Sequence, residues 1–330
     1  MSARLPPRPD PPHPQSGGAR PGLRPRFRAG PATGAVAPHQ PQHLARLRRA
    51  ERRAGPRGRP PVNAPSVRAL GLISGWGDGV EAIPADATSA AAGRPLLSLG
   101  RPPVEGERFR RATRECLWAL AVVERMLEDG RAEREAIAGE GTALLFVTAA
   151  AYAASNRAFI EGSGGGTHFA YTAPAVVPAE VAIEFGVRGP SAIFIGGPPA
   201  TLRAIWHAAT LLDRRVCDRA IVLAVETFEE CADLYARGPR WTVRPLVETA
   251  AALWLERGHG TLALDGGRVA RGRGTAGRAS RLRERLGDTF ACEPLAAVGL
   301  WRREAAADTL VLDGAWQGET AHLMWQKGAG

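Results

Sequence analysis

The segment GVRGPSAIFIGGPPATLRAIWHAATLLDRR, residues 186–215, joins a short apolar strand pattern to an amphipathic helix pattern. SAIFI has the length and composition of a strand, and the apolar spacing over residues 200–212 predicts a helix. A sharp turn is predicted between them, at Gly196, Gly197, Pro198 and Pro199. We call these four residues the elbow. Many enzymes carry a nucleophile on a strand-to-helix turn of this kind, whereas this turn carries a proline.

Apolar strands alternate with helices along the chain from about Ser66. Strands are expected at residues 67–74, 142–149, 219–226 and 249–256, and helices at 109–129, 150–160 and 179–186. After Gly258, a further strand is expected at 260–266, and a last helix–strand pair at 293–305 and 308–314 precedes ETAHLMW. Fully apolar strands that alternate with helices are typical of a sheet covered on both faces. The sequence therefore predicts an α/β layered fold.

The first 65 residues differ from the rest in composition. They contain 13 arginines, 15 of the 27 prolines and only two acids, so their net charge is +11. The remaining residues have 30 basic and 31 acidic side chains, so the excess charge of the chain lies in this leader. A segment so poor in large apolar side chains cannot bury enough surface to fold, and we expect residues 1–65 to be disordered.

Two interpretations of the leader remain open. An arginine-rich arm is able to touch nucleic acid or an anionic membrane. The interpretation that we favour is a solvated extension, or a start codon assigned too far upstream, so a nucleic-acid partner is not expected. The leader lacks the apolar core of a secretory signal, and its prolines interrupt any amphipathic transit helix.

The cysteines and the hydropathy of the chain indicate a cytoplasmic protein. Four cysteines without paired spacing read as reduced, mostly buried thiols rather than a zinc site or a disulfide framework: Cys116, Cys217, Cys231 and Cys292. The chain has no run of about 18 apolar residues, so no membrane span is expected.

Four motifs, in order, resemble the N-terminal half of the β-ketoacyl synthases, which are members of the thiolase superfamily. VRALGLISGWGDGVEAI (67–83) is similar to that family's first strand and glycine turn, and TAPAVVPAEVAIEFGVRGPS (172–191) to the segment before its nucleophile. RAIVLAVET (219–227) is similar to the strand after the nucleophile helix, and RPLVETAAALWLERG (244–258) to a later strand segment. The resemblance implies a thiolase-like αβαβα layered fold.

The resemblance places the family's nucleophilic cysteine at Pro198. In the family, that cysteine takes the acyl chain as a thioester, and its backbone N–H belongs to the oxyanion hole. Proline supplies neither a nucleophile nor an N–H, and the loss of one oxyanion donor typically costs about 2.7–4 kcal/mol of transition-state stabilisation. Proline suits the first turn of a helix, so Pro198 preserves the structure and removes the chemistry.

No other residue is expected to take over the chemistry. Cys217 lies beyond the elbow helix and Cys231 follows the next strand, so we interpret both as packed thiols. The family uses two histidines of its C-terminal half to decarboxylate the malonyl unit, and no such pair is recognised here. We assign no catalytic residue, no cofactor and no metal.

Each histidine after the leader has a simpler interpretation. His168 lies in a glycine-rich loop, and His207 reads as a structural histidine on a helix with an apolar face. His259 belongs to an HGT triplet that comes too early in the chain for the family's motif. His322 is displaced by about three residues from the family's histidine or threonine position, where Glu319 stands.

The C-terminal part is short for this family. A thiolase-type second half has about the length of the first half, yet only 72 residues follow Gly258. CEPLAAVGLW and the segments after it resemble only the closing helix and strands of that half. We therefore expect a leader at 1–65, a ketosynthase-like N-terminal domain at 66–258 and a truncated C-terminal remnant at 259–330.

The motifs together predict a non-catalytic ketosynthase-like protein of fatty-acid or polyketide biosynthesis, comparable to a chain length factor. Because the family dimerises by continuing its sheet across a two-fold axis, the expected partner is an active ketosynthase or a second copy, with an acyl carrier protein as a further partner. Two alternatives stay open. One is an active acyl-thioester transferase or condensing enzyme with a non-standard nucleophile, and the other is a decayed relative.

Overall fold

The computed structural model describes residues 60–104, 106–110, 112–149, 159–162, 172–228, 244–268, 279–304 and 307–328. Within these ranges, none of the helices is long and apolar enough to cross a membrane. Of the leader predicted at residues 1–65, residues 1–59 lie outside the described residues. Val62 pairs with Leu262 through backbone hydrogen bonds of 3.0 and 2.9 Å, and Ala64 is buried. Folded contacts therefore begin before Ser66. The helix predicted at 150–160 falls almost entirely outside the described residues.

A six-stranded mixed sheet contains most of the predicted strands. They lie in the order β2, β1, β8, β6, β4, β5. Their bounds are β1 Ser66–Ser74, β2 Gly77–Asp78, β4 Thr142–Thr148, β5 Ser191–Ile195, β6 Arg219–Glu226 and β8 Thr249–Glu256. β4 pairs in parallel with β5 and β6, whereas β8 is antiparallel to β1 and β6. β6 and β8 have the predicted bounds, because a continuous apolar run fits a strand that is buried on both faces.

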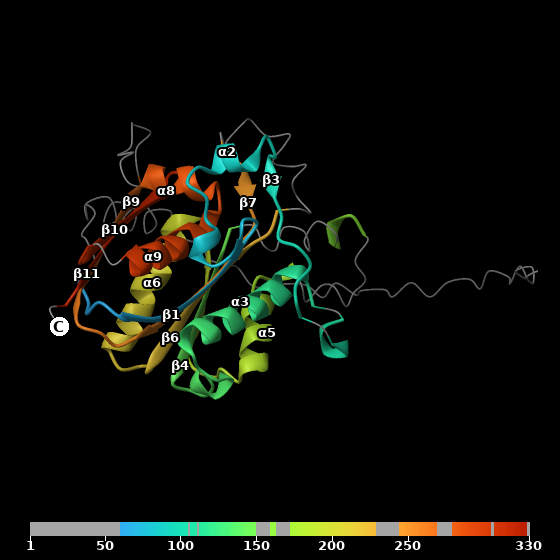
Figure 1. Ribbon diagram of the computed structural model, residues 1–330. Coiled ribbons are helices and arrows are strands. Elements are labelled where there is room, and N and C mark those ends of the chain that lie inside the picture. Colours follow the sequence, from blue (N-terminus) through green and yellow to red (C-terminus); the bar gives the residue numbers. More distant parts are fainter. Residues whose placement is uncertain are drawn as a thin grey trace, which may run out of the picture. The chain divides into compact units, whose positions relative to one another are not determined.

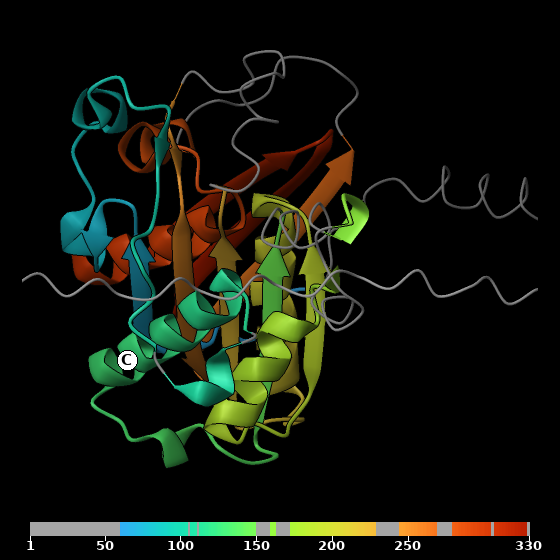
Figure 2. The ribbon, with the colours of Figure 1, turned by 90° about the vertical axis from the view of Figure 1, so that its right-hand side faces the viewer.

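Helices cover both faces of this sheet (Figure 2). α3 (Arg114–Gly130) and α5 (Val176–Phe185) lie on one face, and α6 (Pro198–Asp213) and α9 (Glu293–Glu304) lie on the other. The helix predicted from Phe109 starts at Arg114 instead. Phe109 ends a separate 3-10 turn, and Thr113 has an extended backbone with φ −73° and ψ 162°. α5 starts three residues earlier than predicted, and its Pro178 stands in the first turn, where proline is tolerated.

A second sheet of three antiparallel strands packs against α6 and α9. Its order is β10, β11, β9, with bounds β9 Gly260–Arg268, β10 Thr309–Trp316 and β11 Glu319–Lys327. Gln317 and Gly318 both have positive φ, as a tight two-residue hairpin requires. A short helix, α8 (Ala279–Leu286), precedes α9 in a region where the sequence pattern is weak.

The layers follow the predicted α/β arrangement. Figure 1 shows α6 and α9 between the two sheets, so the described residues form helix, sheet, helix and sheet layers. The predicted α/β layered fold is confirmed, with four of the five layers of the αβαβα arrangement among the described residues. No helix among the described residues covers the outer face of the three-stranded sheet.

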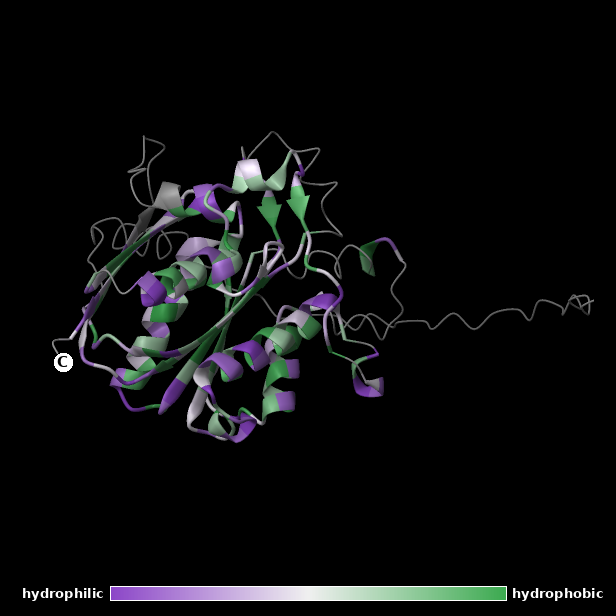
Figure 3. Cartoon of the chain, in the orientation of Figure 1, coloured by the Kyte–Doolittle hydropathy of each residue, from purple (hydrophilic) through white to green (hydrophobic). Residues whose placement is uncertain are grey.

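A single hydrophobic cluster links the two sheets through α6. It includes Leu145 of β4, Ile205 of α6 and Leu323 of β11, which are all buried. A second cluster joins α3 to the opposite face of the six-stranded sheet and includes Phe146 of β4. Figure 3 shows the apolar strands between the helical layers. Consecutive residues of β4 therefore enter two different cores, which explains why the strand is apolar along its whole length.

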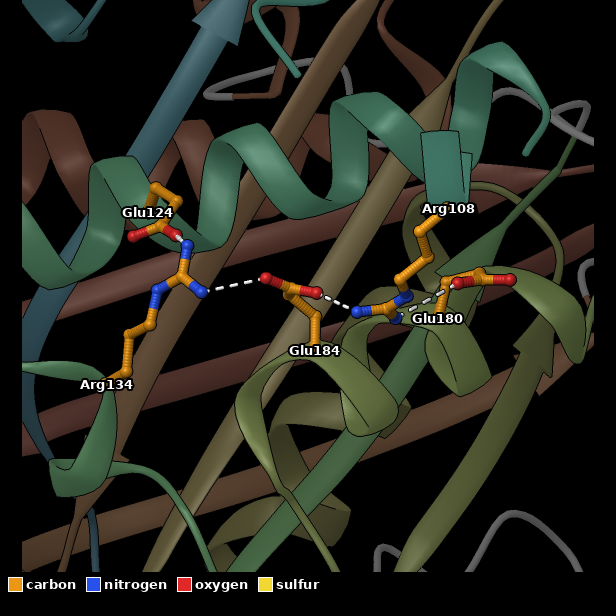
Figure 4. Close-up of polar contacts among 5 residues, drawn as sticks. All are labelled: Arg108, Glu124, Arg134, Glu180 and Glu184. Atoms are coloured by element: carbon orange, nitrogen blue, oxygen red, sulfur yellow. Dashed lines mark hydrogen bonds and ion pairs between the residues drawn. The ribbon is translucent and has the colours of Figure 1, made fainter. Parts of the chain in front are cut away.

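Charged side chains tie the segment before α3 to α5. Arg108 pairs with Glu180 at 3.5 Å and with Glu184 (Figure 4). Arg134 pairs with the other oxygen of Glu184 at 2.8 Å and with Glu124 of α3. Because the two arginines are about half exposed, these pairs fix the geometry of the surface more than they stabilise the fold.

A buried acid holds the far end of the six-stranded sheet. Glu248 lies between β8 and the short strand β7 (Leu246–Val247), which pairs in parallel with β3 (Leu96–Leu97). Its carboxylate is fully buried and accepts hydrogen bonds from Arg114 and from the backbone N–H groups of Leu99 and Phe228, the last two at 2.7 Å. This network fixes the start of α3 to the end of the sheet.

Candidate functional site

The elbow lies at the junction of β5 and α6. Gly196 follows β5, has φ +145° and donates its N–H to the carbonyl of Thr148 at 2.9 Å. Gly197 is the residue before the helix, and Pro198 is the first helical residue. The predicted strand–turn–helix is therefore present, and residue 198 stands at the head of the helix between the two sheets.

The elbow is packed directly against the end of β10. A Cβ atom on Gly197 would lie 2.6 Å from the indole ring of Trp316, and one on Gly314 would lie 2.8 Å from the backbone nitrogen of Pro199. Only glycine fits at these two positions. The contact brings the last part of the chain onto the turn, with Pro198 and Pro199 buried beneath it.

The first turn of α6 offers no hydrogen-bond donor to a ligand. Pro198 and Pro199 have no N–H, and the N–H of Ala200 donates to the carbonyl of Gly197 at 2.9 Å. The N-terminus of a helix normally attracts anions because its first N–H groups are free. Here the first three residues of the helix cannot bind an oxyanion through the backbone.

Aromatic side chains cover the elbow. The ring centroids of Phe290 and Trp316 are 4.6 Å apart, and those of Phe290 and Phe228 are 4.9 Å apart. Phe290 has φ +46°, a left-handed conformation that is uncommon outside glycine. We call Phe228, Phe290 and Trp316 the aromatic cover. It brings side chains from three separate segments to one place above the turn.

A buried carboxylate lies behind the elbow. Glu226 is the last residue of β6, is fully buried and accepts the N–H of Ala149 at 2.7 Å. It also accepts the N–H of Ala291 at 3.3 Å and the hydroxyl of Thr148 at 3.4 Å. The hydroxyl of Thr201 in α6 donates to the carbonyl of Ala291 at 2.6 Å. These bonds join β4, β6 and α6 to the segment before α9.

The described cysteines are all protonated thiols at neutral pH. Cys292 is fully buried beside Glu226, and burial, with the negative charge of Glu226, raises the pKa of its thiol well above the ordinary value. Its Sγ donates to the carbonyl of Thr249 at 3.2 Å. Burial raises the pKa of Cys116 to about 11 and also raises that of Cys217. Because the thiolate is the nucleophile, none of the three is activated.

The described histidines do not form a pair. His207 packs its ring 6.0 Å from that of Phe194, and His259 is exposed in the turn before β9. His322 contacts Asp313 across the β10–β11 pair on the outer face of the three-stranded sheet, away from α6. His168 and Cys231 lie outside the described residues.

Two features of the site were not predicted from the sequence. Glu226 is the last residue of an apolar strand pattern. An acid at that place must be buried with the strand, so the sequence did contain a signal for a buried carboxylate. The aromatic cover had no such signal. Phe228, Phe290 and Trp316 are far apart in the sequence, and only the packing of β10 on α6 brings them together.

A family model and several solved structures agree with this arrangement. Residues 103–238 match the model of the beta-ketoacyl synthase, N-terminal domain. A search of curated proteins finds no match to the chain. The matched range includes β4, α5, β5, the elbow, α6 and β6.

The similar structures are ketosynthases. One is a type II polyketide synthase acyl-carrier protein in complex with its ketosynthase bound to the hexaketide, AntDE:AntF. It has a TM-score of 0.61 and 14% identity, and the match covers 80% of this chain and 99% of that chain. The ishigamide ketosynthase/chain length factor has a TM-score of 0.58 and 14% identity, with 83% and 100% covered. A beta-ketoacyl synthase from Burkholderia phymatum STM815 has a TM-score of 0.58 and 12% identity, with 81% and 100% covered.

The family model and the similar structures support two separate statements about the chain. Sequence identity with the similar structures is low, so they establish the fold, while the family model identifies the segment around the elbow. Residues 103–238 are therefore similar to the N-terminal domain of the beta-ketoacyl synthases, and the fold of the chain is similar to the folds of structures that contain ketosynthases and chain length factors.

Proposed function

We propose that this chain is a non-catalytic ketosynthase-like subunit that works beside an active ketosynthase in fatty-acid or polyketide biosynthesis in the cytoplasm. The observation that carries the proposal is the head of α6. Pro198 and Pro199 leave neither a nucleophile nor a free backbone N–H in the first turn. We also propose that residues 66–258 correspond to the N-terminal half of a ketosynthase and residues 259–330 to a shortened C-terminal half.

In this proposal, Pro198 occupies the position of the family's nucleophile, and Gly196, Gly197 and Pro199 keep the shape of the turn. Without a nucleophile, no acyl-enzyme forms at this place. The protonated state of the described thiols supports the proposal, because a replacement nucleophile would need a lowered pKa. The aromatic cover supports it as well, because it packs against the turn where an acyl chain would have to enter.

The free edge of the six-stranded sheet supports the proposed partner. β5 is the last strand of that sheet among the described residues, and its Ile193 and Ile195 are 40% and 51% exposed. An apolar edge strand is a template for pairing with another chain. The similar structures include a ketosynthase/chain length factor and an acyl-carrier protein in complex with its ketosynthase. These are the partner classes that we propose.

Co-purification tests the proposal. The full chain is co-expressed with a cysteine-bearing ketosynthase from the same genome, and the complex is measured by size-exclusion chromatography with light scattering. We expect a heterodimer. Ile195→Arg should abolish it, because an arginine on the edge strand opposes pairing. Val216→Arg is the matched control, since Val216 is 52% exposed but lies in the turn after α6.

The outcomes are distinct. A complex that survives Ile195→Arg would move the interface away from β5. The proposed role would be contradicted if the chain binds neither the ketosynthase nor an acyl carrier protein.

A further inference from the structure

Phe290 is the central ring of the aromatic cover. Its ring centroid lies 4.6 Å from that of Trp316 and 4.9 Å from that of Phe228, so it contacts both of the other rings. Trp316 in turn lies against the elbow, because a Cβ atom on Gly197 would be 2.6 Å from its indole ring. Phe290 therefore holds Trp316 against the head of α6, where Pro198 is buried.

The backbone of Phe290 carries a local cost in this position. Its φ of +46° lies in the left-handed region, where the Cβ atom of a bulky side chain crowds the neighbouring carbonyl. A residue keeps such a conformation only where its surroundings enforce it, and strained residues of this kind gather at switch regions. A rotation of Phe290 out of the left-handed region would relieve the strain and withdraw the ring from the cover.

The side chain next to Phe290 carries a second cost. Thr289 is 1% exposed, and its Oγ1 has no hydrogen-bond partner among the described residues. A buried hydroxyl without a partner has lost its hydrogen bonds to water and gains none in exchange. An opening that lets water reach Thr289 would restore them. Two adjacent residues therefore favour an open arrangement, and the packing of the Phe290 ring opposes it.

Hydrogen bonds fix the chain on both sides of these two residues. On the N-terminal side, the carbonyl of Asp288 accepts the N–H of Val247 at 3.0 Å. On the C-terminal side, the carbonyl of Ala291 accepts the hydroxyl of Thr201 at 2.6 Å. The N–H of Ala291 donates to Glu226 at 3.3 Å. A movement between these anchors is confined to the two residues that lie between them.

The ring of Phe290 belongs to a small hydrophobic cluster. Three of its members are buried, namely Phe228, Leu246 and Phe290, and three are partly buried around them, namely Leu96, Ala149 and Trp316. The clusters on the two faces of the six-stranded sheet are much larger. Local opening costs the least free energy where few buried apolar contacts are lost. The aromatic cover is therefore a favourable place for local opening.

We infer that Phe290 is a gate over the elbow, and that its opening gives an uncharged apolar ligand access to the head of α6. The ligand class follows from the site behind the gate. Pro198 and Pro199 have no N–H and the N–H of Ala200 is already bonded, so an anion finds no backbone donor there. An apolar chain would instead contact proline and aromatic side chains. The inference rests on the proposed function, because it concerns the same elbow, but its test involves no partner, so the two fail separately.

Cysteine labelling of the full chain tests the gate. Pro198→Cys places a thiol behind Phe290, and peptide mass mapping follows its reaction with N-ethylmaleimide, which is uncharged. Each rate is divided by the rate in the unfolded chain. A local opening exposes little surface, so the labelling rate at position 198 should not change with urea at low concentrations. Cys116, which is fully buried in α3, is the internal control, and its labelling should rise steeply with urea because only global unfolding exposes it.

Phe290→Ala, made in the Pro198→Cys background, removes the gate. Labelling at position 198 should become faster by about tenfold or more in the absence of urea, because the ring no longer has to move. Phe185→Ala is the matched control. Phe185 is 2% exposed and lies in α5, in the cluster on the opposite face of the sheet, so its truncation should leave this labelling rate unchanged.

Thr289→Val, in the same background, should close the gate more firmly. Labelling should become slower by about threefold to tenfold, because the closed state no longer contains a hydroxyl without a partner. Thr142→Val is the matched control. The Oγ1 of Thr142 is also buried and has no partner within the described part of the chain, but Thr142 is the first residue of β4, far from the anchors of the gate. This variant should not change the labelling rate at position 198.

Four results would overturn the inference. They are a labelling rate at position 198 that rises with urea as steeply as that of Cys116, a rate that already equals the rate in the unfolded chain, equal rates with and without Phe290→Ala, and equal rates with and without Thr289→Val. Urea denaturation shows whether each variant folds. If Phe290→Ala does not fold, Phe290→Leu replaces it and should also speed labelling, by a smaller factor.

Discussion

In the six-stranded sheet, β4 is buried at every residue and β6 and β8 at all but one, while β11 of the three-stranded sheet alternates between buried and exposed residues. The first sheet has helices on both faces, and the second has described helices on one face only. The difference shows where the fold is anchored. We expect most of the stability to come from the first sheet and from the helices between the two sheets, because their side chains are the most completely buried among the described residues.

The largest expected effect is at Glu248. Glu248→Ala should lower the free energy of unfolding by about 3–5 kcal/mol, because it leaves Arg114 and two backbone N–H groups without their buried partner. Urea denaturation measures the loss. Glu304→Ala, which removes an exposed acid near the three-stranded sheet, is the control and should cost less than about 1 kcal/mol. Equal losses of unfolding free energy in Glu248→Ala and Glu304→Ala would contradict the expected difference between the two regions.

Truncation of one apolar residue in each sheet compares the two sheets directly. Leu145→Ala should cost about 2–5 kcal/mol, because Leu145 is fully buried between the sheet and α6. Met324→Ala should change stability by no more than about 0.5 kcal/mol, because Met324 is 39% exposed on the outer face of β11. Urea denaturation measures the change in the free energy of unfolding for both variants. A large loss in Met324→Ala would show that another part of the chain covers that face.

The pH dependence of stability tests the junction between α8 and α9. Burial raises the pKa of Glu293 from 4.5 to about 7, against the opposing effect of Arg283. Folding therefore favours the protonated acid, and this group lowers the free energy of unfolding by about 1–3 kcal/mol as the pH rises from about 5 to above 7. Glu293→Gln should remove that slope, and Glu304→Gln should not. If the free energy of unfolding of Glu293→Gln falls with pH as steeply as that of the wild type, other groups cause the pH dependence.

The smallest expected effect is in the ion pairs of Figure 4. Arg108→Ala should lower the free energy of unfolding by less than about 1 kcal/mol, because the side chain is 44% exposed. A double-mutant cycle with Glu184→Ala measures the coupling energy. Coupling well above about 1 kcal/mol would mean that these pairs anchor the helical layer of the first sheet as strongly as a buried pair does.

The strands and the elbow were predictable from the sequence, because their signals are local. RAIVLAVE and TAAALWLE have the composition of buried strands, and they form β6 and β8 with the predicted bounds. Pro198 suits the first helical position and is found there. The start of α3 was misplaced because Phe109 continues the apolar periodicity but belongs to a separate turn.

The surroundings of the elbow were not predictable, because they depend on contacts between distant segments. Trp316 meets Gly197 only because β10 runs across the head of α6. Glu226 binds the N–H of Ala291, 65 residues away in the sequence. The exposure of Ile193 and Ile195 follows from the place of β5 at the sheet edge, which the pattern SAIFI does not reveal.

Intact-protein mass spectrometry determines whether this chain takes an acyl group, at the head of α6 or at any other residue. The full chain is incubated with acyl- and malonyl-thioesters, beside a cysteine-bearing ketosynthase as the positive control. We expect an unchanged mass for this chain and an acyl adduct on the control. A stoichiometric acyl adduct on any residue of the chain, or decarboxylation of the malonyl-thioester by the chain alone, would contradict it.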